Sequence, residues 1–172
     1  DLGDDQLNAT KGQQDYGPFA DKAKLNACLE ANGISTKAQV LGAHPVTVDG
    51  VAGRRTVSRV PNNLNMYFRV DRRIAFDGKF AVSFEVTYYD TGTFGWTLQY
   101  DATEAPYKGA KTIVNQGTNT WKTVTITVDD ARFAERENEQ TDLRIASDQP
   151  VTLHSVRATV TGDGVLPMDL CP

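Results

Sequence analysis

The chain has 172 residues, of which 40% are hydrophobic and 23% are charged, a composition typical of one globular domain with a sizeable core. Its formal net charge of −4 argues against nucleic acid and against an anionic membrane as partners, because both favour a basic protein surface. The sequence contains no run of about eighteen apolar residues, so it predicts no membrane-spanning helix.

Residues 1–37 are predicted to form an N-terminal arm and a helix that precede the main domain. Residues 1–17 are polar and have no period, and the chain begins without Met or an apolar leader, which we interpret as a processed chain or an excised domain. Residues 18–31 predict a helix, because Pro18 suits a first helical turn and apolar side chains recur at helical spacing until Asn32-Gly33.

From residue 38 onward the apolar residues recur with a period of two, which predicts β-strands. We therefore predict an all-β domain over residues 38–162, an antiparallel jelly-roll β-sandwich. Residues 163–172 are expected to form a tail that packs back on the N-terminal segment. The segments that alternate, with turn signals between them, are 64–70, 79–90, 93–101, 121–128, 142–146 and 151–160.

Several motifs in this region resemble a known class of domain. The runs "FEVTYYD", "LQYD", "NTWKT" and "DARF" are similar to those of galactose-binding-like β-sandwich modules of the carbohydrate-binding-module type. Such modules are commonly attached to secreted glycoside hydrolases and polysaccharide lyases. The resemblance covers roughly residues 38–161 and does not include the predicted helix. It implies a sugar ligand, and for some members a structural Ca²⁺, although other members bind nothing known.

Strand direction sorts the predicted loops into two ends of the sandwich, because adjacent antiparallel strands run in opposite directions. Loops 71–79, 102–106 and 129–140 fall at one end, and loops 61–63, 90–93, 114–120 and 147–150 fall at the other. The second end gathers an aromatic, carboxylate and amide set that suits a sugar, with a flat ring for C–H groups and polar atoms for hydroxyls. The candidate carbohydrate-binding residues are Tyr89, Asp90, Asn115, Asn119 and Trp121.

Trp121 has two interpretations that the sequence leaves open. It shares parity with Thr123 and Thr125, opposite to the apolar set of its strand, so alternation points it outward as a platform for a sugar ring. Residues at strand ends also turn back over the core edge, which would make it structural. Trp96, by contrast, shares parity with apolar neighbours and is predicted to lie in the core. Amides such as Asn115 form turns as readily as they contact ligands.

The loop after residue 128 is dense in acidic side chains. Asp129, Asp130 and Asp142 are candidate Ca²⁺ ligands, because this ion prefers several carboxylate and carbonyl oxygens. Their spacing does not match an EF-hand loop. The alternative is a solvated charged loop whose acids pair with the interleaved arginines.

Cys28 and Cys171 lie near opposite ends of the chain. They are either two buried free thiols or one disulfide, and we favour the disulfide. Closing so long a loop contributes about 4–5 kcal/mol in the chain-entropy model. A disulfide also predicts an oxidising compartment, hence a secreted or extracellular protein.

No catalytic signature is present: the sequence has no GxSxG, P-loop, HExxH or GxGxxG motif. We therefore predict a non-catalytic carbohydrate-binding module of a secreted polysaccharide-degrading system. Its expected partners are a polysaccharide or oligosaccharide and a neighbouring catalytic domain. The alternatives are a small polysaccharide lyase or hydrolase that uses loop carboxylates, and a structural spacer domain without a ligand.

Overall fold

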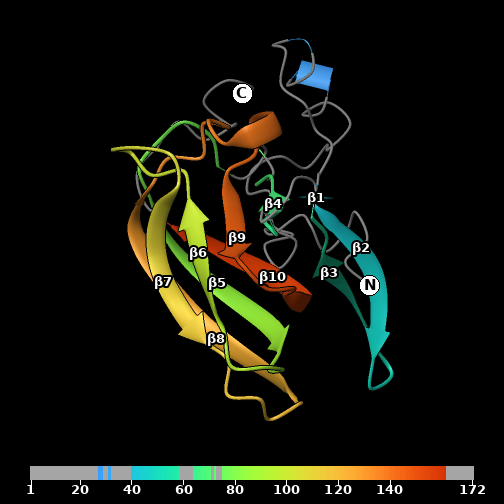
Figure 1. Cartoon of the computed structure of the whole chain (residues 1–172). Helices are drawn as coiled ribbons and strands as arrows, with labels where there is room; N and C mark the ends of the chain where they lie inside the picture. Colours follow the sequence, from blue (N-terminus) through green and yellow to red (C-terminus); the bar gives the residue numbers. More distant parts are fainter. Residues whose placement is uncertain are drawn as a thin grey trace.

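A computed structural model describes residues 27–28, 31, 40–58, 64–70, 72 and 75–161. Two five-stranded antiparallel sheets pack face to face in this part of the chain (Figure 1). In order across the sheet, sheet A contains β1 (Val40–Leu41), β4 (Met66–Phe68), β9 (Leu143–Ser147), β6 (Gly95–Tyr100) and β7 (Lys108–Val114). Sheet B contains β2 (Ala43–Val48), β3 (Val51–Thr56), β10 (Thr152–Thr161), β5 (Phe80–Tyr89) and β8 (Trp121–Ala131). A short 3₁₀ turn, η1 (Asn138–Gln140), precedes β9.

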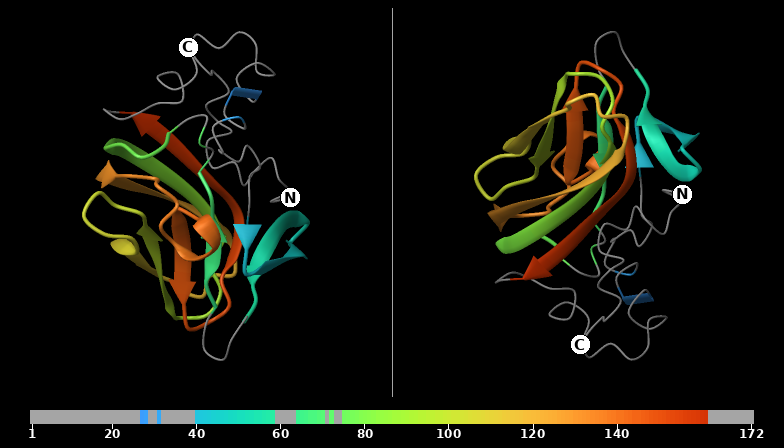
Figure 2. Two further views of the ribbon diagram at one scale, coloured as in Figure 1. Left: turned by 90° about the horizontal axis from the view of Figure 1, so that it is seen from above. Right: turned by 90° about the horizontal axis from the view of Figure 1, so that it is seen from below.

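The strand order is that of a jelly roll. Without the edge strands β1 and β2, the order across sheet B is β3, β10, β5 and β8, and the order across sheet A is β4, β9, β6 and β7. This is the order of two Greek keys wrapped into two sheets. The predicted antiparallel β-sandwich is therefore confirmed, and β1 and β2 each add one strand at an edge. Figure 2 shows the two layers from above and below.

The core lies between the sheets and follows the period-two pattern. Along β5 every second side chain is buried, from Phe80 to Tyr88, while the residues between them are not. Phe133, from the loop after β8, stacks on Phe80 with ring centroids 6.1 Å apart. Trp96 is 1% exposed and packs edge-on against Tyr88 at 5.1 Å, so its predicted place in the core is confirmed.

Hydrogen bonds between loops show which of them meet at each end. The amide N–H of Gln116 donates to Asp90 at 2.7 Å, joining loops 90–93 and 114–120. At the other end the amide of Gly78 donates to the carbonyl oxygen of Arg132 at 3.1 Å. The grouping of these described loops agrees with the prediction from strand direction. Loop 61–63 lies outside the described residues.

The terminal predictions fall mostly outside the described residues. Of the predicted helix over residues 18–31, only Ala27, Cys28 and Ala31 are described, and these three are helical. Cys171 and the tail 163–172 are not described, so the disulfide and the packing of the tail stay predictions. Within the described part of the chain, no helix is long and apolar enough to cross a membrane.

Candidate functional site

Asp90, a predicted sugar ligand, holds the loop that follows β7. Its side chain is fully buried and accepts the amide of Gln116 at 2.7 Å and the hydroxyl of Thr118 at 2.6 Å. The ammonium group of Lys122 lies 2.6 Å from it. Burial alone would raise the pKa of Asp90, but the Lys122 ion pair and these hydrogen bonds outweigh it and hold the pKa well below its usual range. Its oxygens are therefore already used within the protein.

The two predicted amides lie in the same loop. Asn115 is buried, accepts the indole N–H of Trp96 at 3.1 Å and donates to the carbonyl oxygen of Thr91 at 2.8 Å. Asn119 is exposed and adopts a φ of 53°, a left-handed turn conformation that Asn tolerates better than most residues. Its carbonyl oxygen accepts the hydroxyl of Tyr89 at 2.9 Å. These contacts give the loop its shape, and a ligand role for either amide stays a prediction.

Trp121 lies outside the core cluster, on the outer face of sheet B, which agrees with its parity. It is half-buried, because the β2–β3 hairpin packs against it. Its indole N–H donates to the carbonyl oxygen of Val48 at 3.2 Å, and its ring packs edge-on against Tyr89 and His154 at 5.2 and 6.0 Å. The hydroxyl of Tyr89 also reaches Asp49 at the tip of the hairpin, at 2.9 Å. Trp121 therefore points away from the core of the sandwich but is covered by the β2–β3 hairpin.

The three predicted Ca²⁺ ligands have separate surroundings. Asp142 is buried and accepts the amides of Val70 and Glu135 at 2.8 and 2.9 Å. Asp130 bonds Tyr100 and Lys108 instead, and Asp129 is exposed. Among the described residues, no group of three or more His, Cys, Asp or Glu side chains is arranged to hold a metal. Calcium binding stays a prediction, which a melting temperature that rises with Ca²⁺ concentration would support.

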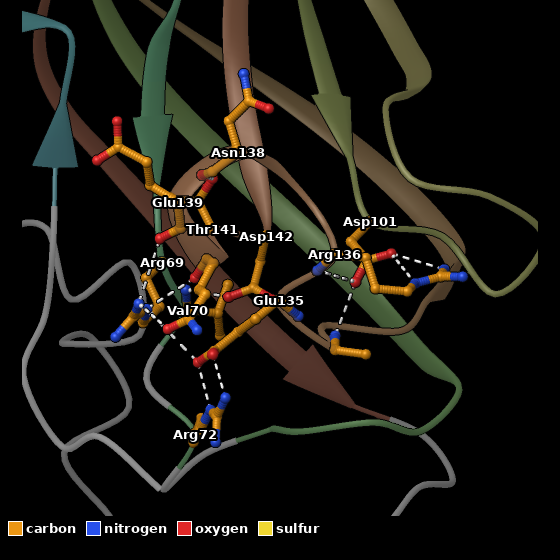
Figure 3. A network of polar contacts seen from close by, with 12 residues as sticks. Arg69, Val70, Arg72, Asp101, Glu135, Arg136, Asn138, Glu139, Thr141 and Asp142 are labelled. Atoms are coloured by element: carbon orange, nitrogen blue, oxygen red, sulfur yellow. Dashed lines mark hydrogen bonds and ion pairs between the residues drawn. The ribbon is translucent and has the colours of Figure 1, made fainter.

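A polar network at one end of the sandwich holds the acidic loop 129–140 in place (Figure 3). Asp101 accepts the amide of Ala134 and the guanidinium of Arg136, each at 2.8 Å. Glu135 bonds Arg72 and lies within 3.5 Å of Arg69, whose Nε donates to the carbonyl oxygen of Gln140 at 2.9 Å. The loop does form salt bridges, but their partners lie outside the loop: Glu135 pairs with Arg69 and Arg72, and Arg136 pairs with Asp101. The expected pairing between acids and arginines within the loop is not what the described residues show.

The pinned loop carries Asn138 onto the outer face of sheet A. The backbone amide of Asn138 donates to the phenol oxygen of Tyr107 at 2.7 Å, and that phenol donates to the side-chain carbonyl of Asn138 at 3.0 Å. The side-chain amide of Asn138 donates to the phenol oxygen of Tyr67 at 3.1 Å. One residue of the loop thus joins two tyrosines that are far apart in the sequence.

Arg144 of β9 lies against both of these tyrosines. Its guanidinium carbon is 4.2 Å from the centroid of the Tyr107 ring and 5.8 Å from that of Tyr67, within cation–π range. Its Nε donates to the side-chain oxygen of Gln99 at 2.6 Å, and its Nη1 donates to the phenol of Tyr67 at 3.3 Å. The guanidinium is therefore held in a fixed plane between the two rings.

An open hollow of about 460 Å³ continues from this cluster along the same face of sheet A. Its size is within the range of small-ligand sites. Asn65 joins the two regions, because it lines the hollow and donates to the phenol of Tyr67 at 3.3 Å. The residues that line the hollow are Asn65, Gly95, Thr97, Thr112, Ala146, Ser147 and Asp148. We call the hollow, together with Tyr67, Gln99, Tyr107, Asn138 and Arg144, the sheet A face.

The pKa values of two ionisable groups at this face are shifted in opposite directions. Burial would raise the pKa of Tyr67, but hydrogen bonds from Asn65, Arg144 and Asn138 to its phenol oxygen outweigh burial and lower it. Glu137 is 4% exposed, and burial raises its pKa to about 8. One of its oxygens accepts the amide of Tyr107 at 3.3 Å, and the other is buried and has no hydrogen-bond partner among the described residues.

None of the residues of the Tyr67–Arg144–Tyr107 cluster was predicted from the sequence, although part of the signal was present. Tyr67 stands between Met66 and Phe68 and so has outward parity, although it is itself only 3% exposed, and Arg144 alternates in the same way with Leu143 and Ile145. Two outward-facing residues on neighbouring strands can form a surface cluster. Their meeting depends on the β4–β9 register, which pairs Tyr67 with Arg144 and which the sequence does not state.

The chain matches no protein-family model and no curated protein. Among solved structures, the CBM35 from Paenibacillus barcinonensis is 15% identical with a TM-score of 0.46, covering 73% of this chain and 93% of that one. CsCBM6-3 from Clostridium stercorarium, solved in complex with cellobiose, is 11% identical with a TM-score of 0.43, covering 73% and 86%. The K1 cleaved adhesin domain of Lys-gingipain from Porphyromonas gingivalis W83 is 9% identical with a TM-score of 0.48, covering 73% and 91%. Similarity at this level assigns neither a family nor a ligand to the chain.

Proposed function

We propose that the protein is a non-catalytic carbohydrate-binding domain whose binding site is the sheet A face. The observation that carries this proposal is the continuity between the hollow and the Tyr67–Arg144–Tyr107 cluster. A saccharide presents hydroxyls that both donate and accept, together with apolar C–H faces. The cluster offers matching groups: amides at Gln99 and Asn138, and the half-exposed ring and phenol of Tyr107, while the buried Tyr67 holds the cluster together.

The sheet A face is a better candidate than the loop end that the sequence selected. At the loop end, Asp90 and Asn115 are buried and bonded to their own loop, and the β2–β3 hairpin packs on Trp121. A ligand there would have to displace internal hydrogen bonds, which leaves buried polar groups without partners. At the sheet A face, the hollow already supplies room beside half-exposed polar groups.

We also propose that the domain acts outside the cell, beside a catalytic domain of a polysaccharide-degrading system. The two cysteines support an oxidising compartment if they pair as predicted. A binding domain of this kind would raise the effective concentration of a polysaccharide near a linked enzyme. Its own affinity would be in the millimolar to micromolar range, about −4 to −8 kcal/mol.

A small polysaccharide lyase or hydrolase is the second candidate function. Glu137, with a pKa raised to about 8, and Tyr67, with a lowered pKa, belong to the same face. Oppositely perturbed groups are what acid–base catalysis requires. Incubation with the polysaccharides that bind, followed by measurement of new reducing ends and of unsaturated products, separates the two functions: binding without product supports the first.

Affinity electrophoresis through gels that contain single polysaccharides tests the proposed function. We expect at least one polysaccharide to retard the protein, and Tyr107→Ala and Gln99→Ala to reduce that retardation. Thr125→Ala on the outer face of sheet B is the matched control, because Thr125 is exposed and distant in topology from sheet A. Migration that no polysaccharide changes would contradict the proposal and favour a spacer domain.

A further inference from the structure

Among the described residues, Arg144 has no acidic partner, unlike the four arginines that surround the acidic loop. Arg69, Arg72, Arg132 and Arg136 each form an ion pair with a carboxylate. The hydrogen bonds of Arg144 go to neutral atoms, the amide oxygen of Gln99 and the phenol of Tyr67. Within the described part of the chain, its Nη2 donates to no atom and no carboxylate pairs with it.

Burial raises the pKa of Glu137, an acid that Arg144 acts on electrostatically, so that this acid is neutral at neutral pH. Arg144 acts electrostatically on Glu137 and favours its ionisation, but burial outweighs this attraction, and the pKa of Glu137 rises to about 8. Asp142 and Asp101 raise that pKa further, and the amide of Tyr107 donates to the carboxyl group. At neutral pH Glu137 therefore leaves Arg144 without an ion pair in the described part of the chain, and Asp148, which lines the hollow, is the remaining acid of this face.

We propose that the sheet A face takes an anionic saccharide, one with a carboxylate or sulfate group, and that this group pairs with Arg144. The inference rests on the proposed function, because it names the class of sugar for the same site. A guanidinium is planar and donates in a fixed fork that matches a carboxylate or sulfate oxygen pair. Tyr107 and Tyr67 hold that plane, and Nη2 forms no hydrogen bond within the described part of the chain.

The charges around the hollow also set the direction of the ligand. Asp148 lies at the end of the hollow that Ser147 and Gly95 line, whereas Arg144 belongs to the other end of the face. An acidic group is attracted by Arg144 and repelled by Asp148, so it occupies the end near Tyr107. The neutral sugar units of the ligand then extend over Thr97 and Ala146, two small residues of the hollow.

Glu137 makes this recognition dependent on pH. Below about pH 8 it is neutral and leaves Arg144 free to attract an anion. Above that pH its carboxylate compensates Arg144 and repels the ligand. The affinity for an anionic saccharide therefore falls as the pH rises through about 8, while the affinity for a neutral saccharide changes little through charge.

Isothermal titration calorimetry with defined oligosaccharides tests the inference. The anionic probes are hexagalacturonate, hexamannuronate and a κ-carrageenan hexasaccharide, and the neutral probes are cellohexaose, xylohexaose and mannohexaose. We expect at least one anionic probe to bind about tenfold or more tightly than every neutral probe, as one charge-assisted contact implies. The carboxylate and sulfate probes show which of the two groups the site prefers.

Variants isolate the role of Arg144. Arg144→Gln should remove the preference for the anionic probe, Arg144→Lys should keep part of it, and Glu137→Gln should remove the loss of affinity above pH 8. Arg157→Gln, at an exposed position of β10 in sheet B, is the matched control and should bind like the wild type. Melting temperatures of all variants show that each one is folded.

The outcomes separate this inference from the proposed function. Neutral probes that bind as tightly as the anionic ones, with Arg144→Gln unchanged in its preference, would overturn the inference and leave the proposed function standing. No binding by any probe would overturn both. An anionic preference that Arg144→Gln retains would assign the anion to another site and overturn the inference as well.

Discussion

The indole N–H of Trp121 donates to the carbonyl oxygen of Val48 at 3.2 Å, so that one side chain of β8 fastens the β2–β3 hairpin to the outer face of sheet B. Three strands, β3, β10 and β5, lie between β2 and β8 in the sheet order. Gly53 lies beside this contact, and a Cβ at that position would be 2.4 Å from the carbonyl oxygen of Leu153, so only glycine lets the hairpin approach β10 this closely. Trp121 therefore faces outward and makes structural contacts with the hairpin, and its role as a sugar platform stays a prediction.

Trp121→Ala should destabilise the domain by roughly 2–3 kcal/mol, because it removes one hydrogen bond and the packing of a half-buried ring. Trp96→Ala should cost more, about 3–5 kcal/mol, because Trp96 is 1% exposed in the core. Denaturant unfolding measures both free energies. The saccharide affinity of Trp121→Ala should equal that of the wild type, and a selective loss of affinity without loss of stability would return Trp121 to its role as a sugar platform.

Asp90→Asn should lower the melting temperature by roughly 4–10 °C near neutral pH, because it breaks the ion pair with Lys122 and weakens the anchoring of loop 115–120. The pKa of Asp90 is lowered in the folded state. Its stabilising effect is therefore present above the ordinary pKa of an aspartate and is lost as the pH falls through the folded value. The difference between variant and wild type should shrink in acid, and a difference independent of pH would contradict this explanation.

The sequence predicted the sandwich because its strongest signal, the period of two, depends only on which side chains are buried. In β5 that signal is complete from Phe80 to Tyr88. Strand direction also sorted the described loops correctly, since each connection in this fold reverses the chain. The same parity placed Trp121 outward, but it did not foresee that Val48 and Gly53 would cover it, because the position of a hairpin relative to a distant strand is a non-local property.

The sheet A face was beyond the reach of these rules for a related reason. Arg144 meets Tyr67 through strand register, and Tyr107 meets Asn138 through the path of an irregular loop. That path requires left-handed backbone conformations at residues such as Tyr107 and Glu139, with φ of 61° and 55°. Neither residue type marks such a conformation in a sequence.

The predicted disulfide between Cys28 and Cys171 should contribute about 4–5 kcal/mol in the chain-entropy model. The native protein should then take up no thiol-alkylating reagent, and should gain two alkyl groups only after reduction. Intact mass measurement under native and reducing conditions shows this directly. Two modified thiols in the native, unreduced protein would contradict the pairing and remove one support for a secreted protein.

The free energy of unfolding should fall as the pH rises from about 4 to about 8. Burial raises the pKa of Glu137 and of Asp142 to about 8 in the folded protein, well above the ordinary values of 4.5 and 3.8. Between those values the folded state holds protons that the unfolded state has released, so the free energy of unfolding falls as the pH rises. The contribution is complete below about pH 4 and lost above about pH 8.

Glu137→Gln should remove part of this slope, because an amide of the same shape does not titrate. Melting temperatures from pH 4 to pH 9 should therefore fall less in the variant than in the wild type, and the variant should be the more stable protein above pH 8. Asp142 retains its own titration in the variant, which leaves a smaller slope. Glu85→Gln is the control, because Glu85 is exposed on sheet B. Parallel curves for wild type and Glu137→Gln would show that Glu137 ionises normally in the folded protein, and would remove the basis for a neutral acid beside Arg144.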